Sequence, residues 1–438
     1  MSLAPRPNAD LDSALAEAEA RYVARNPASK AAYDFACRAM PGGNTRTSLF
    51  YTPFPLTLSH GAGARVTDLD RHSYADFLGE YTAGLYGHSH PVIRAAIDAA
   101  LDRGITLGGH GEAEARLAAA MVDRFPSVER IRFTNSGTEA NLMAVSTARA
   151  VTGRPKLMGM KGGYHGGLLY FADPSMPINA PFPLLLGRYN DLDGCRELIR
   201  RHRDELACVI LEPMLGSAGC VPATQGFLAM LREETAKAGA LLIFDEVMTS
   251  RLGPGGLQGR HGIAPDLTSF GKYIGGGLTF GAFGGRAELL DRFDPRRPDA
   301  IPHAGTFNNN VLTMNAGLAG LTKIYTKEAA EAFNAQGDRL RERLNGLAVR
   351  RGLPVQFTGI GSMMSIHFRD GAIDSYEAVQ AGNLALRPLL QFDLFERGVY
   401  AARRGMFNLM LPMRDEDFDI LASALDEFFE VRAGLLAN

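Results

Sequence analysis

The sequence is poor in cysteine and has no long apolar run. Its four cysteines, Cys37, Cys195, Cys208 and Cys220, show no paired spacing. They predict neither a disulfide framework nor a zinc site, but reduced and mostly buried thiols. No segment approaches the roughly 18 apolar residues of a spanning helix, and the N-terminus carries proline and charge where a signal peptide needs an apolar core. These absences predict a cytoplasmic protein that is neither exported nor in a membrane.

The chain also lacks an excess of charge of either sign. A formal net charge of -2 over 438 residues gives no basis for binding nucleic acid or an anionic membrane, so small molecules are the expected partners. The hydrophobic fraction of 46% and the charged fraction of 21% are ordinary for a globular protein. A chain of this length predicts one large domain and a smaller one.

The N-terminal part predicts helix followed by a hairpin. Alanine-rich periodicity predicts helix over residues 11–40, which Pro41-Gly42-Gly43-Asn44 stops. Two strand-like stretches at 56–58 and 64–67, joined by a glycine-containing turn, predict a β-hairpin.

The middle of the chain alternates apolar strands with amphipathic helices, which is the pattern of a mostly parallel sheet covered on both faces. The predicted strands are Arg130–Thr134, Lys156–Met160, Ala207–Leu211 and Ala240–Phe244. The predicted helices are Pro91–Arg103, Gly111–Arg124, Glu139–Thr152, Gly226–Ala238 and Asn310–Tyr325.

The pattern changes near Glu328, where a long charged helix runs through Arg350. Strands near Val355–Phe357 and Met363–Phe368 and helices at Ser375–Arg397 and Asp415–Ala433 are predicted after it. We therefore predict an α/β fold, with a large domain built on a mostly parallel sheet and a smaller α+β domain. Its predicted parts are residues 1–65 (helical segment and hairpin, part of the small domain), 66–327 (large domain) and 328–438 (C-terminal small domain).

Lys272 stands out because the chain has only seven lysines and this one is soon followed by three consecutive glycines. It comes 27 positions after Asp245, which ends the apolar run 241–244. A lysine that forms a Schiff base needs an uncrowded backbone, and a protonated pyridine nitrogen needs a buried carboxylate. Taken singly, most lysines are surface charges, and an acid after a strand is often a turn or cap. The combination favours a pyridoxal phosphate (PLP) site.

A phosphate site is predicted where Ser136, Gly137 and Thr138 stand between a strand and a helix. The N-terminus of a helix offers unpaired N–H groups and the positive end of a dipole, which suit a phosphate. The alternative is a structural one, because Ser136 and Glu139 also spell a capping box.

A glycine-rich turn at residues 162–167 holds Tyr164 and His165. Such a turn can bring Tyr164 flat against a pyridine ring, although an ordinary turn is the alternative. A metal site at His165 is not favoured, because no second ligand stands nearby at a suitable spacing.

Four further residues are candidates. Glu212 follows an apolar strand and lies at the carboxyl edge of the sheet, where ligands bind in α/β folds, and a plain surface glutamate is equally consistent. Val247 is predicted to pack against the face of the ring. Arg46 and Arg404 lie in predicted loops, and their guanidinium groups suit a carboxylate, although single surface arginines are common in this chain.

These motifs resemble those of the class III, fold-type I PLP-dependent aminotransferases over nearly the whole chain. The matching stretches are Ser136–Ala140, Tyr164–Gly166, Asp245–Val247, Lys272 and Gly305–Phe307. Within the family, the chain resembles the branch that holds the glutamate-1-semialdehyde aminomutases and the β-phenylalanine aminotransferases. It is more similar to the latter, on Asn26–Ser29, Met40–Gly42, Leu49–Thr57, Glu80–Gly84 and Phe307–Asn310.

The resemblance implies a role for each matched position. Lys272 would carry PLP as a Schiff base and move the proton, and Asp245 would keep the ring nitrogen protonated. Thr306 would reach the phosphate of the neighbouring subunit, which implies a homodimer with shared active sites. Arg46 would hold the substrate carboxylate. The remaining implied contacts are ring stacking by Tyr164 and phosphate binding by Ser136, Gly137 and Thr138. Tyr81 with Phe50 or Tyr51 would line an aryl pocket; the alternative is that these aromatic residues belong to the hydrophobic core.

One departure separates the two subfamilies. The mutase pattern carries a glutamate in the C-terminal stretch, where this chain has Arg403-Arg404-Gly405. A second arginine can bind the extra carboxylate of glutamate or 2-oxoglutarate. The resemblance therefore implies ping-pong transamination of an aromatic β-amino acid with 2-oxoglutarate or pyruvate. The alternatives are a glutamate-1-semialdehyde 2,1-aminomutase and a non-enzymatic PLP-binding protein, and the presence of Lys272 argues against the latter.

Overall fold

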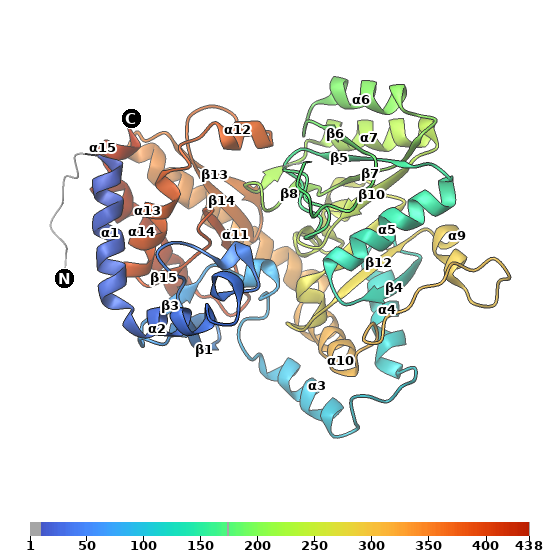
Figure 1. Cartoon of the computed structure of the whole chain (residues 1–438), viewed down its shortest axis with the longest axis horizontal. Helices are drawn as coiled ribbons and strands as arrows, with labels where there is room; N and C mark the ends of the chain where they lie inside the picture. The colour runs from blue at the N-terminus through green and yellow to red at the C-terminus, as the bar shows by residue number, and fades with distance from the viewer. Residues whose placement is uncertain (1–9, 173–174, 438) are drawn as a thin grey trace.

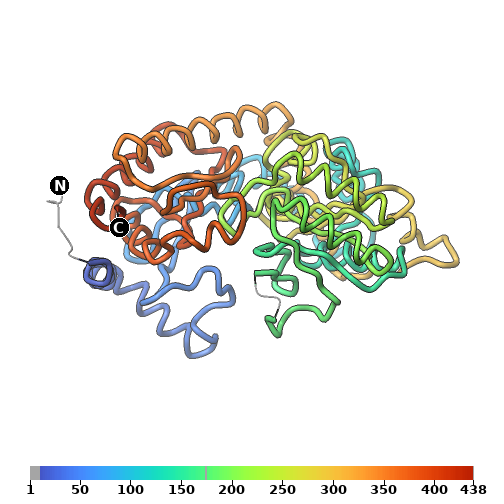
Figure 2. Tube along the Cα trace, turned by 90° about the horizontal axis from the view of Figure 1, so that it is seen from above, coloured from blue at the N-terminus to red at the C-terminus, as the bar shows by residue number. Residues whose placement is uncertain are grey.

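The computed structural model describes residues 10–172 and 175–437. The N-terminal stretch predicted to be no signal peptide lies largely outside the described residues. Figures 1 and 2 show two lobes, one formed by the N-terminal and C-terminal parts of the chain and the other by its middle. The predicted division at residues 65 and 327 stays a prediction. Among the described residues, no helix has the length and apolar character needed to cross a membrane.

Helices make up much of both lobes (Figure 1). The α-helices are α1 (Leu11–Arg25), α2 (Pro27–Ala36), α3 (Pro91–Leu101), α4 (Glu112–Arg124), α5 (Gly137–Thr152), α6 (Leu192–Arg201), α7 (Gln225–Ala238), α8 (Gly256–His261), α9 (Ala287–Leu290), α10 (Val311–Ala319), α11 (Lys327–Arg350), α12 (Tyr376–Gln380), α13 (Leu386–Glu396), α14 (Asp415–Val431) and α15 (Ala433–Leu436).

A seven-stranded sheet forms the centre of the lobe built from the middle of the chain. Its order is β4-β12-β11-β10-β7-β5-β6, and only β12 runs antiparallel to its neighbours, which confirms a mostly parallel sheet. The strands are β4 (Arg130–Thr134), β5 (Lys156–Met160), β6 (Leu184–Gly187), β7 (Leu206–Leu211), β10 (Leu241–Asp245), β11 (Leu267–Gly271) and β12 (Gly281–Gly285).

Helices cover both faces of this sheet, as the alternation predicted. Successive residues of a strand point to opposite faces. Accordingly Ile210 packs in one apolar cluster with residues of α5, whereas Leu211 packs in another with residues of α7. Burial on both faces explains why β7 and β10 are continuous apolar runs.

The other lobe holds smaller sheets. In one of them β15 (Val399–Tyr400) pairs in parallel with β3 (Ser73–Asp76), which joins the C-terminal part of the chain to the N-terminal hairpin. The remaining strands are β1 (Leu58–Ala62) and β2 (Arg65–Asp68) in that sheet, the antiparallel β13 (Val355–Ile360), β14 (Met363–Phe368) and β16 (Met406–Asn408), and the small hairpin of β8 (Met214–Leu215) and β9 (Val221–Pro222).

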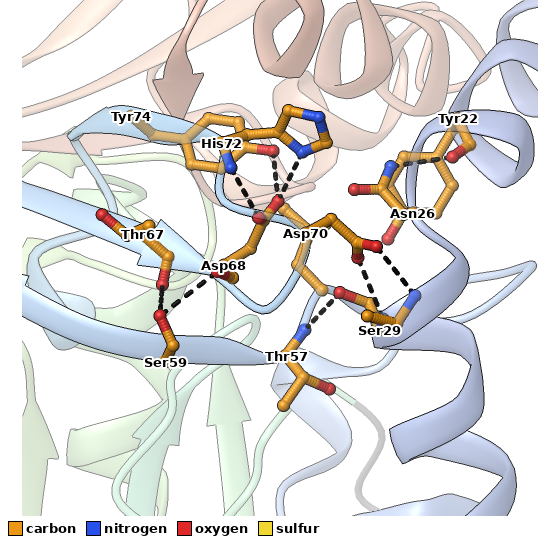
Figure 3. A network of polar contacts seen from close by, with 12 residues as sticks. Tyr22, Asn26, Ser29, Thr57, Ser59, Thr67, Asp68, Asp70, His72 and Tyr74 are labelled. Carbon is orange, nitrogen blue, oxygen red and sulfur yellow. Dashed lines mark hydrogen bonds and ion pairs between the residues drawn. The ribbon is translucent and has the colours of Figure 1, made fainter.

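The single helix predicted over residues 11–40 is wrong, because α1 and α2 are separate helices. Asn26 between them has φ -124° and ψ 49°, and a residue before proline is disfavoured in the helical region. The carboxylate of Asp70 accepts hydrogen bonds from the backbone N–H groups of Ala28 (2.7 Å) and Ser29 (2.9 Å) at the start of α2 (Figure 3). The hydroxyl of Ser29 in turn accepts the N–H of Thr57, so α2 is fixed to the β1–β2 hairpin.

Other differences have local causes. The helix predicted over Ser375–Arg397 is broken between α12 and α13, where the N–H of Asn383 donates to the carbonyl of Phe368. The helix predicted over Asn310–Tyr325 is α-helical only to Ala319 and continues as a short π-helix, Gly320–Ile324. The thiols are free, and three of the four are buried, as predicted.

Candidate active site

A cavity of about 300 Å³ lies at one edge of the seven-stranded sheet, where β4, β5, β7, β10 and β11 all end. Ligands bind outside the carboxyl ends of strands in folds of this kind. The cavity is lined by eight of the residues that the sequence predicts to contact PLP. They are Ser136, Gly137, Thr138, Tyr164, Glu212, Asp245, Val247 and Lys272.

Asp245 is the buried carboxylate of this site, with 3% of its surface exposed. Its Oδ2 accepts a hydrogen bond from Asn141 Nδ2 at 2.8 Å and lies 2.7 Å from His165 Nδ1. Its Oδ1 accepts the backbone N–H of Val247 at 3.0 Å. These hydrogen bonds fix the position of the carboxylate. A buried carboxylate at this place is what a protonated ring nitrogen requires.

The sequence analysis missed Asn141, which contacts Asp245, and Ser269, which contacts Asn141 in turn. Asn141 lies on the buried face of α5, one turn after Gly137, and is 1% exposed. The hydroxyl of Ser269 at the end of β11 donates to Asn141 Oδ1. A lone polar residue on an otherwise apolar helix face is a signal that could have identified Asn141. His165 was considered only as a metal ligand, and its contact with Asp245 gives it a different role.

The start of α5, where a phosphate site is predicted, lines the cavity. Ser136 is the N-cap, and its Oγ accepts the N–H of Glu139 at 3.2 Å, so the predicted cap is present as well. The helix has 16 residues, and Gly137 and Thr138 of its first turn line the cavity. The first N–H groups of a helix have no partner within it and suit a phosphate. A Cβ at Gly137 would lie 2.9 Å from Val247, so only glycine lets Val247 and the helix start approach this closely.

Glu212 anchors the loops around the cavity. Its Oε1 accepts the N–H of Tyr164 at 3.0 Å, and its Oε2 accepts the N–H of Gly216 at 2.9 Å. Burial raises the pKa of Glu212 to about 7. The ring of Tyr164 is 44% exposed and packs edge-on to Tyr170, so it lies at the open side of the cavity.

Lys272 follows β11 with a positive φ of 54°, a conformation that costs free energy for residues other than glycine. Its amine donates to the carbonyl of Tyr81 at 2.8 Å. Removal from water and the nearby positive charge of Arg404 together lower the pKa of Lys272 to about 7. The amine is therefore largely neutral and nucleophilic just above neutral pH.

Two arginines gather beside this lysine. The guanidinium carbon of Arg404 lies 4.4 Å from the ring centroid of Tyr81, and that of Arg46 lies 5.9 Å from it. Arg46 also forms an ion pair with Glu80. Arg404 has no carboxylate partner among the described residues, and its Nε is buried without a hydrogen bond. Positive charge is thus available for a carboxylate next to the amine of Lys272.

The structure does not bring every candidate to the cavity. Thr306 is exposed and does not line the cavity of its own chain. Tyr51 lies in the apolar core, where its ring packs near Phe392 and Phe395, which fits the plain-core alternative. Phe50 is 37% exposed. No group of three or more metal-ligating side chains occurs within residues 10–172 and 175–437.

The chain shows clear similarity to known proteins. The family profile described as aminotransferase class III matches residues 48–405. A β-phenylalanine transaminase of Variovorax paradoxus is 51% identical over 98% of this chain and 99% of its own length. The crystal structure of a β-phenylalanine aminotransferase from this organism superposes with a TM-score of 0.96, over 97% of this chain and 99% of that one. A glutamate-1-semialdehyde 2,1-aminomutase of Nitratidesulfovibrio vulgaris is 37% identical over 91% of this chain and 97% of its own length.

Proposed function

Because the chain belongs to the class III aminotransferases, PLP-dependent enzymes of fold type I, we propose that it transaminates an aromatic β-amino acid with 2-oxoglutarate or pyruvate as acceptor. The observation that carries this proposal is the position of two guanidinium groups, those of Arg46 and Arg404, at the ring of Tyr81. The backbone carbonyl of Tyr81 accepts a hydrogen bond from the amine of Lys272, so both charges lie close to this amine. The relative of 51% identity, a β-phenylalanine transaminase, supports the substrate class.

The residues of the cavity fit PLP. The start of α5 with Ser136, Gly137 and Thr138 would hold the phosphate, Asp245 would hold the ring nitrogen, and Lys272 would hold the cofactor covalently. The cofactor supplies an electron sink and carries the amino group from donor to acceptor, so the reaction is ping-pong.

Lys272 then acts on protons. With PLP bound, the amine of Lys272 would remove the proton from the amine-bearing carbon of the substrate. Because burial lowers the pKa of Lys272 to about 7, the neutral amine that a base requires is available from about neutral pH upward. In the second half of the reaction, Lys272 returns a proton to the carbon of the oxo acid that becomes the new amino acid. Asn141 and Val247 would keep the carboxylate of Asp245 in place through the hydrogen bonds that they donate to it.

Two arginines suit two different substrates. Arg46 would bind the carboxylate of a 3-aryl-3-aminopropanoate, and Arg404 would bind the second carboxylate of glutamate or 2-oxoglutarate. Tyr81 would hold both guanidinium groups and contribute to the aryl pocket. We also propose a homodimer with shared active sites, in which the exposed Thr306 of each subunit contacts the phosphate bound by the other.

A second candidate function is the intramolecular 2,1-aminomutase reaction on glutamate-1-semialdehyde, because mutases 37% identical to this chain exist. The two are separated by the need for an acceptor. The purified, PLP-loaded protein is incubated with β-phenylalanine and with or without 2-oxoglutarate or pyruvate. Formation of glutamate or alanine only when both substrates are present is expected. Turnover of glutamate-1-semialdehyde to 5-aminolevulinate without any oxo acid, and none of β-phenylalanine, would replace our proposal by the mutase.

A further inference from the structure

We propose that Glu80 is the resting counter-ion of Arg46 and is exchanged for the substrate carboxylate, which makes Glu80 a specificity-determining residue. The inference rests on the proposed function, since it takes Arg46 as the residue that binds the carboxylate. Arg46 Nη1 forms an ion pair with Glu80 Oε1. Arg404, the other guanidinium on the ring of Tyr81, has only the sulfur of Met406 (3.4 Å) as a polar partner among the described residues.

Glu80 lies in a segment whose backbone has positive φ angles. Glu80, Tyr81 and Thr82 have φ values of 47°, 50° and 81°, which makes a left-handed turn of three residues other than glycine. Such a turn persists only where its surroundings fix it, and strained segments concentrate at functional sites. Here Asp76 Oδ1 accepts the N–H groups of Leu78 (2.9 Å) and the residue after it (3.0 Å) at its start.

The end of the turn is fixed as well. The buried Arg251 donates from Nη1 to the carbonyl of Thr82 at 3.3 Å. The hydroxyl of Tyr81 donates to the carbonyl of Ser48 at 2.6 Å, which ties the turn to the loop that carries Arg46. One rigid turn therefore presents the Glu80 carboxylate to Arg46 and the Tyr81 carbonyl to the amine of Lys272.

The ion pair between Arg46 and Glu80 can separate at little cost in free energy. The side chains of Arg46 and Glu80 are 42% and 53% exposed, and ion pairs in contact with water contribute little to stability. When Glu80 leaves, the ring of Tyr81 still supports the guanidinium of Arg46 through a cation–π contact. A substrate carboxylate can thus take the place of Glu80 without moving Arg46. An amine that lacks a carboxylate leaves the pair intact and gains nothing from Arg46.

The test is Glu80→Gln in the PLP-loaded enzyme, with 3-phenylpropanoate as the probe, because it carries the carboxylate and has no amine to react. Its Kd is read from the visible absorption of the holoenzyme, and KM and kcat are measured for β-phenylalanine. Loss of the competing carboxylate is expected to lower Kd and KM by about two- to five-fold, the range that an exposed ion pair represents, with a smaller change in kcat.

Glu197→Gln is the matched control, since Glu197 forms an exposed ion pair with Arg201 on α6, and it should change neither constant. Glu80→Asn is a second variant, because asparagine tolerates the left-handed region. In an Arg46→Gln background, Glu80→Gln should have no further effect on Kd, since the two act through one contact.

An unchanged or higher Kd in Glu80→Gln and Glu80→Asn, or an equal fall in the Arg46→Gln background, would overturn the exchange. Failure of the proposed function looks different, because the wild-type enzyme would then not turn over β-phenylalanine. The binding of 3-phenylpropanoate would still decide the exchange in that case.

Discussion

The amine of Lys272 has an unusual acidity for a lysine. Removal from water disfavours the charged form, and the charge of Arg404 acts in the same direction, so its pKa falls to about 7. Below that pH the amine carries a proton and cannot attack an aldehyde, and above it the amine is free to do so. An exposed lysine would reach this state only near pH 10.

The rate at which the apoenzyme captures PLP covalently should therefore rise with pH through about 7 and level off above pH 8. Stopped-flow measurement of the visible absorption band from pH 5.5 to 10 checks this. Arg404→Gln should move the midpoint to higher pH, because it removes a positive charge near the amine. A rate that continues to climb to pH 10 in the wild-type protein would contradict a depressed pKa.

Asn141 is the residue whose loss should affect Asp245 most directly. Asn141→Leu keeps the volume of the side chain and removes the donor to Asp245 Oδ2. A hydrogen bond to a charged group contributes about 1.5–3 kcal/mol, so kcat for β-phenylalanine should fall about 10- to 100-fold. Steady-state kinetics of the PLP-saturated enzyme gives the value. Loss of thermal stability without loss of kcat would show that Asn141 has only a packing role.

At the scale of elements, we propose that the start of α5 determines how closely the cofactor phosphate approaches. In Gly137→Ala the added Cβ would meet both methyl groups of Val247 at 2.9 Å, so the helix start or Val247 must shift. We expect the Kd for PLP to rise at least about 10-fold, since each N–H to phosphate contact depends on this position.

Gly111→Ala is the control for this substitution. Gly111 also stands at the N-cap of a helix, α4, but its Cβ would meet nothing within 4 Å and its φ of -110° is ordinary. Equilibrium dialysis of both variants against PLP compares them. Equal affinities would mean that the close packing of Gly137 on Val247 does not control phosphate binding.

Elements with a clear apolar pattern were predictable from the sequence. The bounds predicted for β4, β5 and β14 agree with the structure, and each of these strands contains at least two large apolar residues. By contrast, β12 is three-fifths glycine, and Thr268 and Ser269 interrupt the apolar residues of β11, so neither is an apolar run. Both are strands because neighbouring strands pair with them, and a local pattern does not contain that information.

The same limit applies to the site. Residues next to strand ends, such as Asp245 and Glu212, could be predicted because each directly follows an apolar strand, and parallel strands end at the same edge of a sheet. Glu80 and Asn141 were missed because their importance depends on contacts with Arg46 and Asp245, which are far away in the sequence. Only the folded chain brings these pairs together.

At the scale of the whole molecule, the single chain carries apolar surface and a predicted phosphate contact that its own cavity does not use. Phe307 is 60% and Leu107 is 62% exposed, and Thr306 beside Phe307 is exposed as well. Large exposed apolar side chains are typical of an interface. In a two-fold dimer, the same segment of each subunit can serve the site of the other.

Mixed dimers test this sharing. Lys272→Ala removes the essential amine, and Thr306→Glu places a negative charge where we propose that the phosphate of the partner binds, so each variant alone should be nearly inactive. A mixed dimer has one site with an intact Lys272 that faces an intact Thr306. After the two variants are unfolded and refolded together, about a quarter of the wild-type activity should return, because half of randomly formed dimers are mixed and each has one complete site. If Thr306 acted within its own chain, every site would carry one defect and no activity would return.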